Sequence, residues 1–167
     1  MFVLGIDPGL TRCGYACLDG RGHGQARAVA LGVIRTPVTA SLPERLLMLR
    51  EELRFLIAEY RPQAVAVERV FFQVNVRTAM SVGQASGLAL VEAAAAGCEV
   101  VQYSPNQVKD AIAGWGGADK EQMQKMVQLR LGLAAPPKPA DAADAAALAL
   151  CYLAMAPMNR RVAEARA

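Results

Sequence analysis

Apolar residues in the first part of the chain recur in short runs separated by turn residues. The run Phe2–Ile6 is followed directly by Asp7-Pro8-Gly9, and two further apolar segments extend over about 13–18 and 26–35. Runs of this length, bounded by Gly, Pro and Asp, are typical of β-strands and turns. Because the links between them are short, the pattern predicts three strands in an antiparallel meander.

After residue 40 the apolar residues recur at helical spacing. Ser41-Leu42-Pro43-Glu44 has the form of a capping box and is followed by one amphipathic helical face, made of Leu42, Leu46, Leu49, Leu53 and Leu56. Two short apolar runs, 64–67 and 99–102, are predicted as buried strands. Further helices are predicted over 76–96, 105–113, 119–131 and 141–156, with a proline-rich connector at 134–139.

Short buried strands that follow long helices imply parallel crossovers, because a helix must cover the sheet between the two strands. The chain is therefore predicted to be α/β, with a mixed five-stranded sheet (an antiparallel meander plus parallel strands) and helices on both faces. Its 167 residues fit a single domain, which we place at 1–157, followed by a flexible polar tail at 158–167.

Composition narrows the class of protein. Hydrophobic residues make up 54% of the chain and charged residues 20%, which indicates a packed globule. No apolar stretch reaches the ~18–20 residues that span a bilayer, and no secretory signal is visible, so we expect a soluble cytoplasmic protein with no membrane partner. The formal net charge of +3 is compatible with nucleic acid as a partner. The four cysteines and one histidine lack zinc-ligand spacing.

Four carboxylates stand at the ends of apolar segments. Asp7 closes the first strand, Glu68 closes the strand at 64–67, and Asp141 and Asp144 open the last predicted helix. Strand ends of an open α/β sheet are where ligands bind, and residues i and i+3 share one helix face. Taken singly, each carboxylate has a plainer interpretation as a turn residue, a solvated strand end or a helix N-terminal charge.

If the four carboxylates converge, their repulsion destabilises the fold unless cations lie between them. Two divalent ions would cancel the four negative charges, and all-oxygen ligands suit Mg²⁺, with Mn²⁺ as a plausible substitute, better than zinc. Such a site serves two-metal, in-line displacement at phosphorus. The joint pattern therefore predicts metal-dependent phosphoryl chemistry.

The joint pattern resembles the RuvC Holliday-junction resolvases of the ribonuclease-H-like superfamily. The resemblance covers about residues 2–155 and is carried, in order, by Gly5-Ile6-Asp7-Pro8-Gly9, Ala66-Val67-Glu68-Arg69-Val70-Phe71, Gly83-Gln84-Ala85-Ser86-Gly87, Gln107-Val108-Lys109, Ala118-Asp119-Lys120 and Asp141-Ala142-Ala143-Asp144-Ala145. It implies a homodimeric endonuclease of ribonuclease-H-like fold that nicks four-way junction DNA symmetrically in recombination and repair. It also implies a catalytic, Mg²⁺-binding tetrad, and RuvA and RuvB as partners; the tetrad residues are Asp7, Glu68, Asp141 and Asp144.

The same resemblance points to residues that meet DNA. Lys109 and Lys120 match basic residues that line the family's DNA cleft, and Phe71 matches an aromatic residue that contacts bases at the opened junction. Arg69 and Arg77 flank that aromatic segment and are candidates for phosphate contacts. The plainer interpretations are solvated surface cations for all four basic residues, and core packing for one of the two adjacent phenylalanines.

The sequence alone does not decide the role of two further features, and it leaves two competing functions to be considered. Trp115 lies on a glycine-rich loop between two predicted helices, and we favour a role in anchoring that loop to the core over contact with DNA. The small residues between 79 and 96 allow close helix packing, either within the chain or in a dimer. A nuclease of the same superfamily acting on RNA is the main alternative, whereas an actin-like or sugar-kinase-like ATPase needs considerably more chain.

Overall fold

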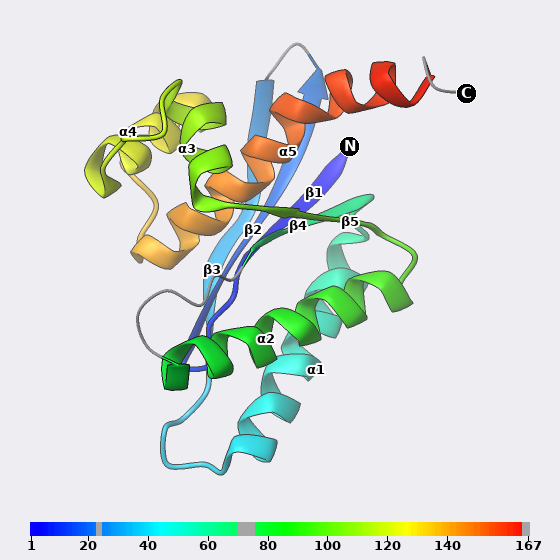
Figure 1. The fold of residues 1–167 in the computed structure, drawn as a ribbon, viewed down its shortest axis with the longest axis vertical. Helices are drawn as coiled ribbons and strands as arrows, with labels where there is room; N and C mark the ends of the chain where they lie inside the picture. Colours follow the sequence, from blue (N-terminus) through cyan, green and yellow to red (C-terminus); the bar gives the residue numbers. More distant parts are fainter. Residues whose placement is uncertain (23–24, 70–75, 165–167) are drawn as a thin grey trace.

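A mixed sheet of five strands forms the middle layer of the structure (Figure 1). The computed structural model describes residues 1–22, 25–69 and 76–164, without the side chains of 76–78 and 157–164. The strands are β1 (Phe2–Asp7), β2 (Arg12–Gly22), β3 (Gln25–Arg35), β4 (Ala64–Glu68) and β5 (Glu99–Tyr103). Their order in the sheet is β3-β2-β1-β4-β5. The first three pair antiparallel, whereas β4 joins β1, and β5 joins β4, in parallel.

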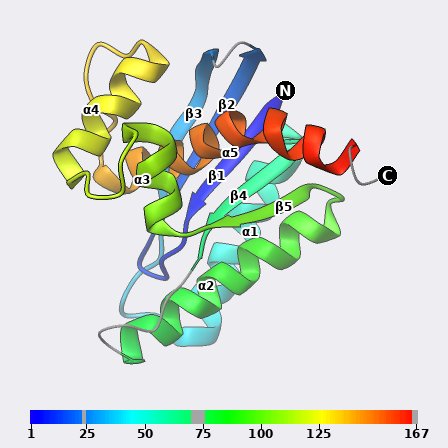
Figure 2. The same cartoon turned by 45° about the horizontal axis from the view of Figure 1, so that its top comes forward.

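Helices cover both faces of this sheet (Figures 1 and 2). One face carries α1 (Leu42–Tyr60) and α2 (Val76–Ala95), and the other carries α3 (Pro105–Ala113), α4 (Lys120–Leu131) and α5 (Ala140–Glu164). Helix α5 packs directly on β1 and β2, and α3 and α4 pack against α5. In the described part of the chain, no helix has a stretch long and apolar enough to cross a membrane.

Local sequence signals account for the helix ends. Glu44 accepts a hydrogen bond from the backbone N–H of Ser41 at 2.8 Å, which completes the predicted capping box of α1. At the start of α4, the carboxylate of Asp119 accepts from the backbone N–H of Gln122 at 2.8 Å. Helix α3 ends at Gly114, whose φ of 83° lies in the left-handed region that glycine adopts without strain. These caps fix where α3 stops and α4 begins.

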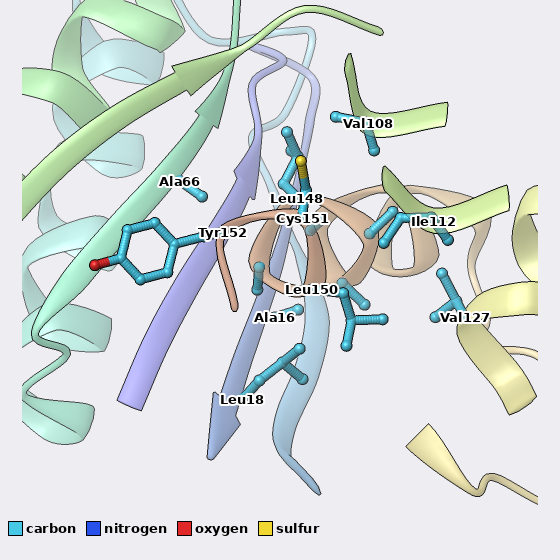
Figure 3. Packing of buried hydrophobic residues seen from close by; sticks show 14 of the residues in the cluster. Ala16, Leu18, Ala66, Val108, Ile112, Val127, Leu148, Leu150, Cys151 and Tyr152 are labelled. Atoms are coloured by element: carbon cyan, nitrogen blue, oxygen red, sulfur yellow. The ribbon is translucent and has the colours of Figure 1, made fainter. Parts of the chain in front are cut away.

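Side chains alternate along β1 and β4, and two hydrophobic cores result. Leu4 and Ile6 of β1 pack with Val65 and Val67 of β4 in the core beneath α1 and α2. The other face is lined by smaller residues, such as Ala66, and packs against α5. Figure 3 shows part of this second core, where side chains of β2, α3, α4 and α5 meet. The alternation therefore assigns each strand residue to one face of the sheet.

Glycines allow α5 to lie unusually close to the sheet. A Cβ added at Gly5 would lie 2.0 Å from the carbonyl oxygen of Ala145, and one added at Gly14 would lie 2.1 Å from that of Asp141. Any side chain at either position would push the N-terminal half of α5 away from the strands. The close approach brings the acidic first turns of α5 against the ends of β1 and β2.

The meander, the parallel crossovers and the predicted helices agree with the sequence-based expectations, with three differences. Strand β2, predicted over about 13–18, extends from Arg12 to Gly22. Leu42, expected on the buried face of α1, is 43% exposed, because the contact of α1 with the core involves its later turns, which include Leu49 and Leu53. Helix α5 continues past Ala156 to Glu164 although it contains Pro157, and residues 160, 161, 163 and 164 (Arg, Arg, Ala and Glu) have high helix propensity. The boundary placed between residues 157 and 158 stays a prediction.

Candidate active site

Asp7 and Glu68 end two neighbouring parallel strands on the same face of the sheet. Ile6 lies opposite Val67 in the register of β1 and β4, so the next residue of each strand, Asp7 and Glu68, also falls side by side. Both follow a residue that packs under α1 and α2, and alternation therefore turns both carboxylates toward α5. The strand pairing alone thus brings together two acids that are far apart in the sequence.

Helix α5 supplies the other two acids, Asp141 and Asp144, from its first turns. The backbone of Asp141 lies against Gly14, and Gly14 is the β2 partner of Asp7. Asp144 follows one turn later on the same side of the helix. All four carboxylates are partly buried, and they are close enough for their charges to interact. The predicted convergence of the acidic residues is therefore present in the fold.

The electrostatics of Asp7 reflect this crowding. Burial raises the pKa of Asp7 to about 7, and the negative charges of Glu68, Asp144 and Asp141 add to the increase. The pKa of Glu68 is raised as well, first by burial and then by the charge of Asp144. The protein alone therefore holds these carboxylates in an environment that penalises their ionised forms, which a cation would relieve.

Two basic side chains partly compensate the α5 carboxylates. Arg12 of β2 donates from Nε to Oδ2 of Asp141 at 3.1 Å, and its Nη2 donates to the same oxygen. This pairing lowers the pKa of Asp141. Lys120 Nζ lies 3.1 Å from Oδ2 of Asp144, and the contact raises the pKa of the lysine. Both cations are partly exposed, with side-chain exposures of 38% for Arg12 and 64% for Lys120.

A cleft of about 250 Å³ opens beside these acids. Its lining joins the ends of β1 and β4 to helices α3, α4 and α5, and includes Asp7, Glu68, Asp144, Lys109 and Lys120. The two lysines predicted to contact DNA therefore lie in the same cleft as three of the four predicted catalytic acids. A cleft lined by both carboxylates and ammonium groups suits a polyanion whose phosphate approaches bound cations.

The donor set fits divalent metal ions by its chemistry. Among the described residues, no three Asp, Glu, His or Cys side chains are gathered tightly enough in their present conformations to ligate one ion. Instead, Asp141 pairs with Arg12 and Asp144 pairs with Lys120. Each contact uses only the Oδ2 atom of its aspartate. Four carboxylates, one of them with a pKa near neutrality, match the hard oxygen ligands that Mg²⁺ and Mn²⁺ prefer.

The remaining predicted residues have different outcomes. Arg69 is exposed directly after β4, and its backbone N–H donates to the carbonyl oxygen of Tyr103 at 2.8 Å; its DNA contact stays a prediction. Phe71 lies outside the described residues, as does the side chain of Arg77. The expectation that Trp115 anchors its loop in the core is wrong, because its side chain is 55% exposed. The glycines around it leave the loop without other bulky groups that would cover the indole.

Arg12 is the site residue that sequence reasoning missed. It lies five positions after Asp7, at the first position of β2, and nothing in its local pattern distinguishes it from a surface arginine. Its partner, Asp141, is 129 residues away in the sequence. One signal could have pointed to it. The sequence predicted four carboxylates at one site, and in the metal-free protein such a group of buried negative charges needs positively charged side chains nearby.

Comparisons with known proteins find relatives that match almost the whole chain. The family model described as crossover junction endodeoxyribonuclease RuvC matches residues 3–152. A RuvC from Roseiflexus sp. (strain RS-1) is 52% identical over 164 residues, which cover 98% of this chain and 97% of the relative. The structure of Thermus thermophilus RuvC in complex with a Holliday junction substrate superposes with a TM-score of 0.90 at 40% identity, covering 95% of this chain and 96% of that one.

A more distant structure supports the fold alone. The yeast mitochondrial Holliday junction resolvase Ydc2 has a TM-score of 0.70 at 14% identity, over 95% of this chain and 82% of the other. This protein and Ydc2 therefore share the fold predicted from the sequence, although few of their residues are identical. Together, the family-model match over residues 3–152 and a relative that is 52% identical over almost the whole length place the chain in the family of crossover junction endodeoxyribonucleases RuvC.

Proposed function

We propose that this protein is a metal-dependent endonuclease that resolves four-way DNA junctions by paired, symmetric nicks during recombination and repair. The observation that carries the proposal is the convergence of Asp7, Glu68, Asp141 and Asp144 beside a cleft that also contains Lys109 and Lys120. The relatives named as crossover junction endodeoxyribonucleases support the reaction, and the Thermus thermophilus complex with a Holliday junction supports the substrate.

Asp7, Glu68, Asp141 and Asp144 would hold two Mg²⁺ ions, with Mn²⁺ as a substitute. When bound there, the ions would supply an activated water and stabilise the leaving oxygen of the cleaved phosphodiester. Positive charge among the acids would also return the pKa of Asp7 toward its ordinary value, so that this carboxylate is ionised at neutral pH. Arg12 keeps Asp141 ionised by pairing with Oδ2.

The basic residues of the cleft would hold the DNA backbone. Lys120 carries three donors on its ammonium group, so it can contact Asp144 and a phosphate together. Lys109 is partly buried on α3 and lines the same cleft. Arg69 is exposed directly after β4, next to Glu68, and is proposed to contact the same backbone. Phe71 joins the proposed DNA-contacting set on the strength of the family resemblance, and Arg77 joins it because it flanks the same segment.

Two symmetric nicks require two active sites, and we propose that a homodimer supplies them. Met80 and Val91 are 59% and 63% exposed on α2, and the positions of Gly83 and Gly87 face open space between them. These four residues share one side of the helix, whereas Ala89 faces the core. The open side of α2 can therefore contact a second copy. We also propose a cytoplasmic location and cooperation with RuvA and RuvB.

Cleavage of synthetic substrates tests the function. The protein is incubated with an immobile four-way junction, a linear duplex of the same sequence and a matched RNA, with Mg²⁺ or with chelator. We expect Mg²⁺-dependent nicks at symmetric positions of the junction and little cleavage of the other substrates. Asp7→Asn should abolish nicking while junction binding persists. Asp19→Asn is the matched control, because Asp19 pairs with Phe2 at the opposite end of β1.

Two outcomes would contradict the proposal. Preferential cleavage of RNA would instead favour a ribonuclease of the same superfamily. Nicking by Asp7→Asn at the wild-type rate would show that the four carboxylates are not the reactive centre. Light scattering of the free protein and of the junction complex tests the dimer separately, and a single copy on a symmetrically nicked junction would contradict it.

A further inference from the structure

The loop between α3 and α4 exposes the only tryptophan of the chain. Its sequence is Gly114-Trp115-Gly116-Gly117, and the indole of Trp115 is 55% exposed. Exposing an indole forgoes the stabilisation that its burial would provide, and isolated exposed apolar residues need no special explanation. The surroundings of Trp115, however, show a supported ring next to the proposed active site.

Glycines hold the ring in place. A Cβ added at Gly117 would lie 2.1 Å from Cζ3 of Trp115, so the indole rests directly on the backbone of that glycine. A Cβ added at Gly116 would lie 3.1 Å from Oδ1 of Asp110, which means that the loop also packs closely on α3. Gly114 turns the chain out of α3 with its positive φ. The six-membered ring of the indole therefore contacts the backbone of Gly117, while the side chain remains largely open to solvent.

The ring adjoins the active-site cleft. Trp115 lines a hollow of about 530 Å³ together with Met126 and Lys125 of α4. Asp119, the residue that caps α4, lines both this hollow and the cleft that contains Lys120. The two depressions therefore share a lining residue at the N-terminus of α4. A strand that passes Lys120 and continues around this helix end would next reach the indole.

The charges around the hollow favour a neutral group over a phosphate at the ring. Besides Lys125, the lining contains Asp119 and Glu121, and their carboxylates repel a phosphate placed on the indole. The carboxylate of Asp119 is already hydrogen-bonded to the N-terminus of α4. An uncharged base, by contrast, can stack on the open side of the ring, and its amino groups can donate to a carboxylate.

We propose that Trp115 is a stacking platform for an unstacked base of the bound DNA, at the point where a strand leaves the active-site cleft past the N-terminus of α4. This inference rests on the proposed function, because it takes the occupant of the cleft to be nucleic acid. Stacking on an aromatic ring is tolerant of sequence, so the contact would strengthen binding of branched or opened DNA without selecting one base strongly.

Intrinsic fluorescence tests the contact in the unmodified loop. Because Trp115 is the only tryptophan, its emission reports on this one site. An immobile four-way junction is titrated into Asp7→Asn protein, which should bind without nicking, while anisotropy of a labelled junction follows binding independently. We expect the emission to be quenched along the same binding curve. Unchanged emission at saturating junction would overturn the proposal, as would quenching by a basic peptide but not by DNA.

Variants give a second measurement. Trp115→Ala should weaken junction binding by about 5- to 150-fold, the range that one base–aromatic stack contributes, and Trp115→Phe should restore most of the loss. Leu129→Ala is the matched control, because Leu129 is 62% exposed on α4 but lines neither the hollow nor the cleft. Equal affinity of the alanine variant and wild type would refute the stacking role. A Trp115→Ala protein that does not fold leaves the fluorescence titration as the deciding test.

The two proposals fail in different ways. Wild-type protein that neither binds nor nicks four-way junctions would contradict the proposed function itself. Protein that binds and nicks junctions normally, but shows unchanged Trp115 emission and no loss on substitution, would contradict only the stacking contact.

Discussion

Replacing Asp7 with asparagine should stabilise the metal-free protein while it abolishes nicking. Asp7 is partly buried beside three other carboxylates, and its pKa is raised from 3.8 to about 7. In the unfolded chain the same group ionises at its ordinary pKa. Folding at neutral or alkaline pH without metal therefore carries the cost of placing a negative charge where the neutral form is preferred. Asparagine keeps the size of the side chain and removes that cost.

The size of the effect follows from the two pKa values. Each unit of pKa difference corresponds to 1.36 kcal/mol, so the change from 3.8 to about 7 amounts to about 4 kcal/mol at pH 8. The difference between variant and wild type should fall to about 3 kcal/mol at pH 6 and below about 1 kcal/mol at pH 4. The sign follows from proton binding: between the two pKa values the folded state holds a proton that the unfolded state has lost, so wild-type stability falls as the pH rises through this window.

Urea unfolding in the presence of a chelator measures this directly at pH 4, 6 and 8. We expect the midpoint of Asp7→Asn to exceed that of wild type increasingly with pH, and at pH 8 the thermal midpoint should rise by roughly 8–16 °C. Asp19→Asn, whose carboxylate lies near the N-terminal ammonium group instead, is the control. The reasoning is refuted if Asp7→Asn and wild type unfold alike at pH 8, or if their difference does not change with pH.

Three further predictions concern the metals, the arginine and the helix contact. Saturating Mg²⁺ at about 100 times its dissociation constant should stabilise wild type by about 2.7 kcal/mol in urea unfolding at pH 8, and Asp7→Asn should lose most of this gain; equal gains would argue against binding at Asp7. Arg12→Ala should leave Asp141 unpaired and weaken Mn²⁺ binding about 10- to 100-fold in calorimetric titration. Arg12→Lys should recover part of this loss. Tighter Mn²⁺ binding by Arg12→Ala than by wild type would show instead that the arginine competes with the metal. Gly5→Ala should destabilise the protein by about 3 kcal/mol or more, because its Cβ would meet the carbonyl oxygen of Ala145 at 2.0 Å; an unchanged urea midpoint would contradict the close packing of α5.

Local and periodic signals made most of the fold predictable. The strand of residues 2–6, the capping box at Ser41 and the helix over 105–113 each depend on neighbouring residues, and the structure has all three. The acids were predictable as a group because Asp7 and Glu68 end strands that must both be buried. When those two strands pair in parallel, their carboxyl ends lie at the same edge of the sheet, so the two carboxylates lie close together in most arrangements.

Features that depend on distant contacts were not predictable in the same way. Arg12 can pair with Asp141 only because α5 lies very close to β2. Gly14 permits this close approach, but its role is visible only when the position of the helix on the sheet is known. Trp115 reads as a core anchor by its size, whereas Gly117 seats its ring at the surface. Helix ends are set by the balance of weak propensities and contacts, so α5 continues beyond the expected end at Ala156.

The central claim is that the four carboxylates at the ends of β1, β4 and α5 form the metal centre of a junction nuclease. A crystal structure of the protein soaked with Mn²⁺ tests it most directly, because the anomalous signal locates the metal without assumptions about activity. We predict signal bounded by Asp7, Glu68, Asp141 and Asp144, and its loss in Asp7→Asn crystals. Mn²⁺ bound elsewhere, with these four carboxylates free of metal in the wild-type crystals, would contradict the account.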